Sequence, residues 1–69
     1  MRYAIVIEKA EGNYSAYVPD LPGCVSCGNS IEEVEQMIRE AIQGHIQLMR
    51  EHGDPVPPPR SVARVVRAA

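Results

Sequence analysis

The first hydrophobic pattern along the chain lies in residues 2–9, RYAIVIEK, and predicts a β-strand. Tyr3, Ile5 and Ile7 fall on one face of this strand, and Ala4 and Val6 fall on the other, because successive strand side chains point to opposite faces. Apolar side chains on both faces indicate burial on both faces. The rest of the chain supplies only one helix to cover a sheet, so we expect another chain to cover the second face.

Two further short strands follow the first. Residues 10–13 contain Gly12-Asn13 and are typical of a turn, after which residues 14–18 return as the second strand of a hairpin. Residues 24–27, Cys-Val-Ser-Cys, form a short third strand that ends at Gly28-Asn29. The pattern therefore predicts three strands before the helix.

The segment between the second and third strands, VPDLPGC at residues 18–24, predicts a rigid corner. Pro19 and Pro22 each fix their own φ near −65°. Each also keeps the backbone of the residue before it out of the helical region. Gly23 can adopt the positive φ that a sharp turn requires. Such a corner either presents side chains to a partner or simply connects two strands, and the local chemistry leaves both readings open.

A long amphipathic helix begins after Ser30. The Ser30 hydroxyl can accept from the Glu33 N–H while the Glu33 carboxylate reaches back to the Ser30 N–H, which is a capping box. The helix is expected to run to about His52 with Gly53 as its C-terminal cap. Its apolar positions share one face: Ile31, Val34, Ile38, Ala41, Ile42, His45, Leu48 and Met49.

The last part of the chain predicts a connector and a fourth strand. Residues 54–59, DPVPPP, favour an extended polyproline segment that crosses back over the sheet. Residues 61–67, SVARVVR, are rich in valine and predict a strand whose arginines suit a sheet edge. The alternative is that this strand pairs with another protomer. The resulting order, β-β-β-α-β, describes one α+β domain over residues 1–69, with an antiparallel sheet and a helix on one face.

Length and charge point to association with other proteins. A chain of 69 residues buries only about 60% of its unfolded surface, and domains of this size are often stabilised by oligomerisation. The acids outnumber the bases before Pro55, most of the excess lying in the helix, whereas only bases follow it. An acidic helix suits a basic partner and would repel nucleic acid, and three tail arginines are too few for a nucleic-acid footprint. No segment resembles a membrane span or a signal peptide, so we expect a cytoplasmic protein.

The residue types that could carry catalysis or bind a metal do not form a credible site. Cys24 and Cys27 precede the helix and point to opposite faces of a strand, which argues against a redox pair. Their spacing relative to His45 and His52 matches no usual zinc finger. There is no nucleophile elbow, no glycine-rich phosphate loop and no convergent set of strand-end carboxylates. We therefore expect no enzyme, no cofactor and no metal site.

The combination of motifs resembles the HicB-type antitoxins. The resemblance rests on the hairpin that ends in YSAYVPDLPGC, on Gly28-x-Ser30-x-Glu32-Glu33 at the helix start, and on GDPVPxP before a valine-rich strand. It covers nearly the whole chain. The matching positions are Tyr17, Pro19, Asp20, Leu21, Pro22, Gly23, Cys24, Gly28, Glu32 and Glu33.

This resemblance implies a partial, catalytically inactive RNase H-like fold that binds a small basic HicA-type toxin, an mRNA-cleaving protein, and masks its active site. The corner and cap residues, Pro19, Pro22, Gly23, Cys24 and Ser30, would serve the fold. The expected toxin contacts are Asp20, Leu21, Glu32, Glu33, Gln36 and Glu40. Many members also carry a C-terminal DNA-binding module, and this chain stops after the last core strand, so operator binding is not expected.

Three functions stay open at this point. The first is a dimeric or higher-oligomeric antitoxin domain that occludes an RNase toxin. The second is an orphan HicB-like oligomeric domain, regulatory or structural, without a toxin. The third, ranked far below these, is a residual RNase H-like nuclease.

Overall fold

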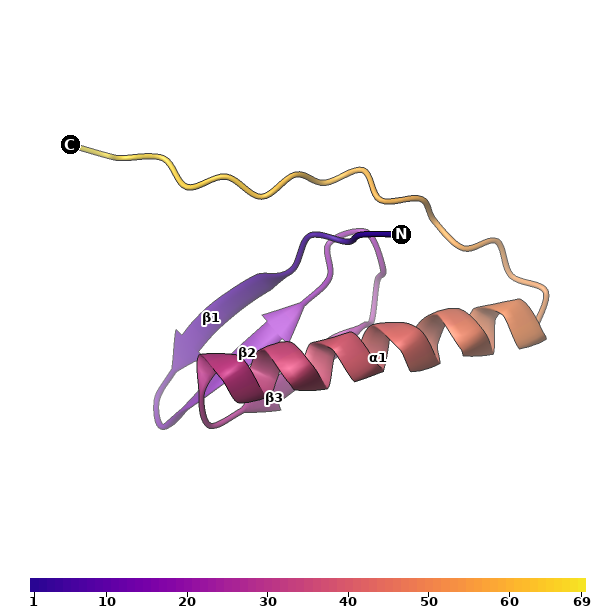
Figure 1. Cartoon of the computed structure of the whole chain (residues 1–69), viewed down its shortest axis with the longest axis horizontal. Helices are drawn as coiled ribbons and strands as arrows, with labels where there is room; N and C mark the ends of the chain where they lie inside the picture. Colours follow the sequence, from indigo (N-terminus) through magenta and orange to yellow (C-terminus); the bar gives the residue numbers. More distant parts are fainter.

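The structure of the protein, a computed structural model, describes all residues from 1 to 69 and consists of a three-stranded antiparallel sheet and one long helix (Figure 1). The strands are β1 (Val6–Ala10), β2 (Asn13–Tyr17) and β3 (Val25–Gly28), in the spatial order β1-β2-β3. The helix α1 (Ile31–Glu51) lies on one face of the sheet. The predicted α+β class, with strands before the helix, is confirmed.

Strand β1 begins later than its sequence pattern predicts. Val6 pairs with Tyr17, the last residue of β2. Beyond that pair, the N–H of Val18 donates to Cys24 O at 3.1 Å, and Pro19 has no N–H to offer. Residues 2–5 therefore have no ladder partner, although Tyr3 and Ile5 still pack against the core.

The corner between β2 and β3 consists of two successive β-turns. The N–H of Leu21 donates to Val18 O at 3.1 Å, and the N–H of Cys24 donates to Leu21 O at 3.0 Å. A proline occupies the second position of each turn, and Gly23, third in the second turn, has φ 84°, as a type II turn requires. Val18, Leu21 and Cys24, the residues that bound the two turns, are all buried.

The start of α1 is fixed by side-chain capping and by close packing. Ser30 Oγ accepts from the Glu33 N–H at 3.1 Å, as predicted. The Glu33 carboxylate accepts from the N–H of Asn29 at 3.2 Å rather than from that of Ser30. Gly28 is needed because a Cβ there would lie 2.9 Å from the backbone N of Val34. At the other end, His52 caps the helix and Gly53 follows with φ 73°.

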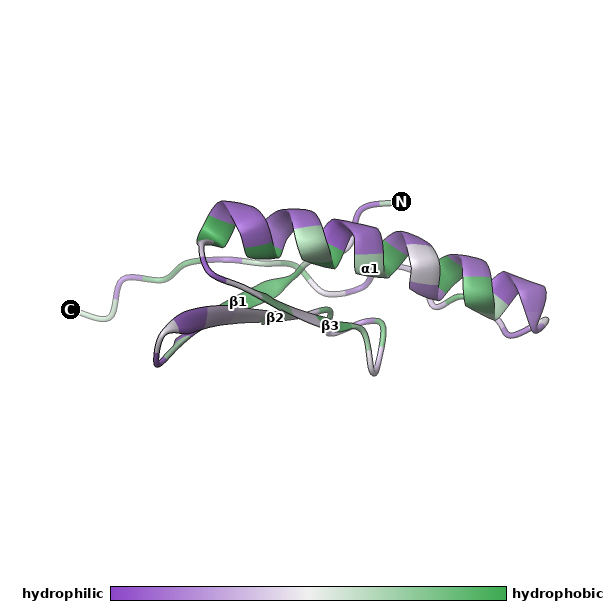
Figure 2. Cartoon of the chain, turned by 90° about the horizontal axis from the view of Figure 1, so that it is seen from below, coloured by the Kyte–Doolittle hydropathy of each residue, from purple (hydrophilic) through white to green (hydrophobic).

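The apolar stripe of α1 faces the sheet (Figure 2). Val34 and Ile38 are fully buried, and Ala41, Ile42 and Ile46 pack around the core. Ile46 was not included in the predicted stripe, whereas Ile31 and Leu48, which were included, are about half exposed at 48% and 52%. The helix is longer than the strands, so its C-terminal half extends past the sheet and leaves part of the stripe uncovered.

The predicted fourth strand is absent from the single chain. Residues 54–69 are extended but form no strand, and no backbone–backbone hydrogen bond involves a residue beyond Asp54 (Figure 1). The valine-rich composition indicated strand propensity correctly, but a strand also needs a neighbouring backbone with free N–H and C=O groups. Within one chain, the backbone of this segment forms no such hydrogen bonds with a neighbouring strand.

The buried position of Leu21 generates a stability prediction. We expect Leu21→Ala to lower the free energy of unfolding by about 2–5 kcal/mol, because it removes a core side chain that is 1% exposed. Leu48→Ala, at a half-exposed helix position, should change it by less than about 0.5 kcal/mol. Urea denaturation followed by circular dichroism measures both values. Equal effects of the two substitutions would show that the corner is not part of the core.

Candidate protein-binding surfaces

Asp20 holds the C-terminal segment against the corner. Its Oδ2 accepts from the backbone N–H groups of Arg60 and Ser61, both at 2.8 Å, and its Oδ1 accepts from the Ser61 hydroxyl at 2.9 Å. The N–H of Ser61, then that of Arg60, lowers the pKa of the Asp20 carboxyl group below its ordinary value. The carboxylate that the sequence assigned to a toxin contact is thus engaged by its own chain. Its distant partner, Ser61, could not be identified from sequence.

A second contact holds the polyproline connector. The Tyr3 hydroxyl donates to Pro57 O at 2.6 Å, across 54 residues of sequence. Together with the Asp20 contacts, it fixes residues 57–61 over the corner and the N-terminal segment. Sequence reasoning assigned no such role to Tyr3, and an aromatic residue in a strand carries no signal that its hydroxyl has a specific partner.

Leu21 does not lie at the surface. Its side chain is 1% exposed and belongs to the core cluster with Ala16, Val34 and Ile38. This placement removes Leu21 from the surface that the molecule offers to a partner. The spacing of Val18, Leu21 and Cys24, one apolar residue every third position, was the available signal that the corner folds inward.

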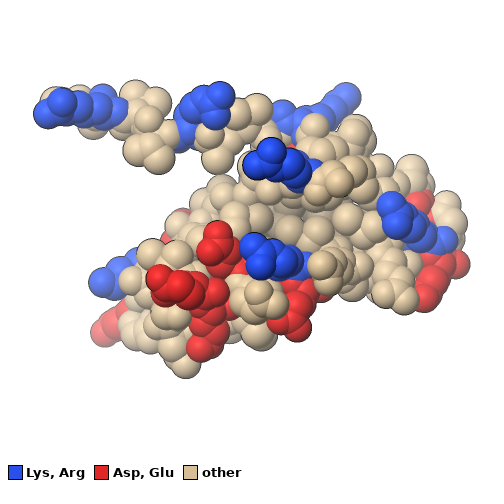
Figure 3. All heavy atoms as spheres, viewed as in Figure 1, with Lys and Arg blue, Asp and Glu red and all other residues tan.

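The acidic residues of α1 form an exposed surface on its N-terminal half, as predicted. Glu32, Glu33, Gln36 and Glu40 are all exposed. Gln36 is held from two sides, because its amide nitrogen donates to Glu40 Oε2 at 3.2 Å and its Oε1 accepts from Arg39 at 3.3 Å. Figure 3 shows acidic side chains gathered at this end of the molecule, with basic side chains along the C-terminal segment. We call the four residues the acidic helix surface.

The face of the sheet that points away from α1 carries an apolar row. Val6 pairs with Tyr17, and Tyr17 pairs with Val25, so the three side chains lie side by side across the sheet. Tyr17 is 41% exposed and Val25 is 63% exposed. The first strand was predicted to be apolar on both faces, and Val6 indeed faces away from the core residues Ile5 and Ile7. This row is an apolar surface that the single chain leaves open.

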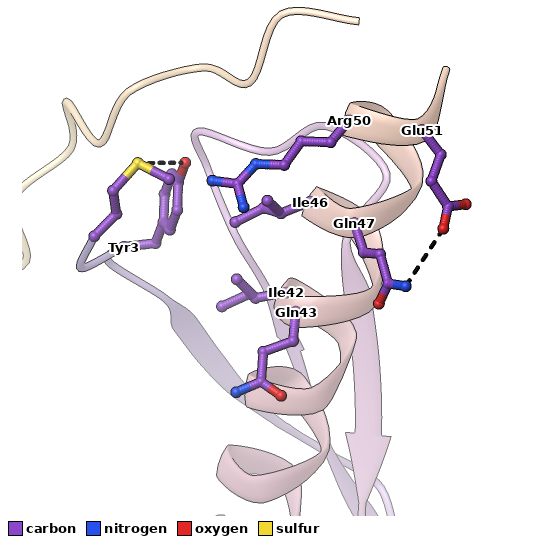
Figure 4. Close-up of a pocket in the computed structure, with 8 residues that line it drawn as sticks. Tyr3, Ile42, Gln43, Ile46, Gln47, Arg50 and Glu51 are labelled. Atoms are coloured by element: carbon purple, nitrogen blue, oxygen red, sulfur yellow. Dashed lines mark hydrogen bonds between the residues drawn. The ribbon is translucent and has the colours of Figure 1, made fainter. Parts of the chain in front are cut away.

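A groove runs between the N-terminal segment and the C-terminal half of α1 (Figure 4). Tyr3 forms one wall, and Ile42 and Ile46 form the opposite wall, with Arg50 and Glu51 at the far end. A second, smaller hollow adjoins it at Tyr3 and Ile42 and is lined further toward the helix N-terminus by Ile5, Ile38 and Glu35; we call the two hollows together the groove. The larger part has a volume of about 640 Å³. The groove exists because residues 2–5 separate from the sheet while the helix extends past it.

The two cysteines lie in different environments. Cys24 is buried in the core, where desolvation raises the pKa of its thiol, and Cys27 is exposed on β3. Both are free thiols. Nowhere in the structure do three side chains of the types His, Cys, Asp or Glu come together in a geometry suited to a metal ion. The single helix is neither long nor apolar enough to cross a membrane.

Comparison with known protein families gives one match that covers almost the whole chain. Residues 3–69 match the family described as HicB-like antitoxin of bacterial toxin–antitoxin systems. Among solved structures, the fold is similar to that of a HicA3–HicB3 toxin–antitoxin complex, with a TM-score of 0.75 and 33% identity. That similarity covers 86% of this chain and 70% of the matched one.

Individual relatives come from phage, archaeal and bacterial sources. The chain is 42% identical over 57 residues to an uncharacterized 14.9 kDa protein of Haemophilus phage HP1, which covers 83% of this chain and 43% of the phage protein. It is 38% identical to a UPF0150 protein of Thermoplasma acidophilum, over 83% of this chain and 84% of that protein. A UPF0150 protein of Helicobacter pylori is 58% identical over 38 residues, 55% of this chain and 53% of that protein. The chain thus spans less than half of its phage relative.

The Asp20 contacts generate a prediction about the C-terminal segment. Asp20→Asn removes the charge that attracts the two N–H donors, so the Arg60 and Ser61 amides should lose protection from hydrogen exchange. Asp54→Asn, at an exposed carboxylate near the helix end, is the matched control and should leave both amides protected. Hydrogen exchange of the two amides, measured by NMR in both variants, tests this prediction. Equal protection of the amides in the two variants would contradict it.

The same contacts predict a pH dependence. Because the pKa of Asp20 is lowered in the folded protein, the contacts should be complete at neutral pH and be lost as the pH falls through that lowered pKa. The amide resonances of Arg60 and Ser61 should therefore shift only in acid, below the ordinary range of a carboxyl group. A shift near neutral pH would contradict the assignment to Asp20.

Proposed function

The chain belongs to the HicB-like antitoxin family, and on this basis we propose that it binds a small basic RNase toxin of the HicA type and occludes its active site. It acts as a non-catalytic inhibitor in the cytoplasm. The similarity to the antitoxin-containing complex supports a toxin partner for this chain. The observation that carries the proposal is the acidic helix surface.

The acidic helix surface has the properties of a docking site for a basic protein. Its side chains stand on a helix of 21 residues that is capped at both ends, so their spacing is fixed before binding. Glu32 and Glu33 lie in the first turn, and Gln36 and Glu40 continue along the helix. Negative charge gathered on one surface steers a basic partner and discriminates against acidic ones.

The proposed contact residues are Glu32, Glu33, Gln36 and Glu40. Leu21 is excluded because its side chain is buried, and Asp20 contributes through the C-terminal segment that it holds rather than through direct contact. The functional antitoxin is a homodimer or a higher homo-oligomer. The exposed row of Val6, Tyr17 and Val25 supports self-association, since such a row on a small protein gains free energy when another chain covers it.

The alternative is an orphan HicB-like domain that forms oligomers and has no toxin. The apolar row and the groove fit the orphan function as well as they fit the antitoxin function, because both surfaces serve self-association whether or not a toxin is present. The two functions differ in what the acidic helix surface does. An orphan domain does not need it.

Binding to a HicA-type protein encoded next to this chain tests the proposal. We expect a stable complex by isothermal titration calorimetry and loss of RNA cleavage by the toxin when the chain is added. The double variant Glu32→Lys, Glu40→Lys should weaken binding by about tenfold or more, which corresponds to about 1.4 kcal/mol. Affinity should also fall as salt concentration rises.

The matched control is the double variant Glu51→Lys, Asp54→Lys, which reverses the same number of charges at the other end of the helix. It should leave the affinity nearly unchanged. If the control weakens binding as much as the double variant, only net charge matters and the acidic helix surface is not the site. If the toxin neither binds nor is inhibited, the orphan function replaces the proposed one.

A further inference from the structure

One edge of the sheet and one segment of the chain both lack a partner. Strand β1 is the first strand in the order β1-β2-β3, so its outer edge carries free N–H and C=O groups. Residues 2–5, which lead into it, have no ladder partner on either side. Beside this edge lies the groove between the N-terminal segment and α1, lined by apolar side chains: Tyr3, Ile5, Ile38, Ile42 and Ile46.

The unpartnered segment is the chain end, residues 62–69. Val62 is 70% exposed, Val65 is fully exposed and Val66 is 83% exposed. Hydrogen bonds in this segment join only neighbouring residues, from Arg64 to Ala63 and from Arg67 to Ala69. Three exposed valines in an extended backbone have the composition of a buried strand without its surroundings.

The contacts of Tyr3 and Asp20 explain why the chain end does not fill its own groove. They fix Pro57, Arg60 and Ser61 over the N-terminal segment and the corner. From Ser61 the extended segment runs on to the C-terminus, which lies apart from the sheet and the helix (Figure 1). Its valines therefore end in solvent, where a second molecule can meet them.

We propose that residues 61–67 of a second copy of this chain bind along the free edge of β1 and fill the groove under α1. The exchange is reciprocal, so each molecule of the dimer donates its chain end and receives that of its partner. Backbone hydrogen bonds to the edge of β1 supply affinity, and side chains that enter the groove supply selectivity, as in other cases of strand addition. This inference rests on the self-association proposed above and assigns it to the edge of β1 and the groove, not to the row of Val6, Tyr17 and Val25, and it does not depend on a toxin.

The dimensions of the two surfaces match. The groove is lined along α1 from Glu35 to Glu51, which corresponds to roughly 24 Å at the helical rise per residue. Seven residues of strand, 61–67, span roughly 23 Å. The rim of the groove carries three arginines, Arg2, Arg39 and Arg50, and two carboxylates, Glu35 and Glu51, so the match rests on length and apolar side chains rather than on charge.

The exchange also completes the sheet that the sequence predicts. The sequence SVARVVR predicts a fourth strand, but within one chain its backbone forms no hydrogen bonds with another strand. Placed on β1 of the partner, it becomes an edge strand with Arg64 and Arg67 as the charged residues that limit further pairing. The fourth strand is then a property of the dimer.

Sedimentation equilibrium of the full-length chain without toxin tests the proposal. We expect the wild type to be a dimer. The tail variant Val65→Asp, Val66→Asp alters both faces of the donated strand at positions exposed in the single chain, so it should not affect folding. It should weaken dimerisation by at least about tenfold. A monomeric wild type, or a tail variant that dimerises as strongly as the wild type, overturns the proposal.

The groove variant Ile46→Arg tests the receiving side, with circular dichroism to confirm that the helix is retained. Its matched control is Leu48→Arg, at a half-exposed apolar position on the same helix that does not line the groove. We expect the groove variant to be monomeric and the control to remain dimeric. If both variants dimerise equally, the groove is not the receiving site.

Mixing the tail variant with the groove variant distinguishes strand exchange from any other dimer. Each variant alone lacks both contacts, whereas a mixed dimer keeps one, formed by the intact tail of the groove variant and the intact groove of the tail variant. The mixture should therefore associate more strongly than either variant alone and more weakly than the wild type. No gain on mixing overturns reciprocal exchange. Because no toxin is present, this result is separate from success or failure of the antitoxin test.

Discussion

Two successive β-turns between β2 and β3 bring three apolar side chains of one short segment into the core. Their two prolines and Gly23 fold seven residues so tightly that Val18, Leu21 and Cys24 all point into the core. These three make up half of the buried apolar cluster. The same turns end the ladder between β1 and β2 and carry Asp20 on the outside, where it holds the C-terminal segment. Packing, strand length and the course of the chain end all follow from this corner.

The small core explains why so much apolar surface remains open. Only six apolar side chains are buried, and one helix covers one face of one sheet. The opposite face keeps its row of Val6, Tyr17 and Val25, and the groove beside the helix stays unfilled. A single layer of helix on a short sheet cannot cover these surfaces, so they stay available for contacts between chains.

Charge separates the two kinds of contact that the molecule offers. The N-terminal half of α1 is acidic and polar, whereas the chain end combines valines with arginines (Figure 3). An acidic, rigid surface suits recognition of a basic protein, and an extended valine-rich segment suits strand pairing. The two surfaces are built from different elements. The proposed self-association and the proposed toxin binding therefore use separate parts of the fold.

The three strands, the capped helix, the rigid corner and the acidic helix surface could all be predicted from the amino-acid sequence. These features depend on local rules: alternation along a strand, the 3.6-residue period, Ser30 as a cap, and prolines in turns. The core position of Leu21, the contact of Asp20 with Ser61 and the lack of a partner for the last segment became evident only in the three-dimensional fold. Each of these depends on which distant backbone comes near. Strand propensity resides in a segment, but hydrogen-bond partners are set by the whole fold and by the chains that it meets.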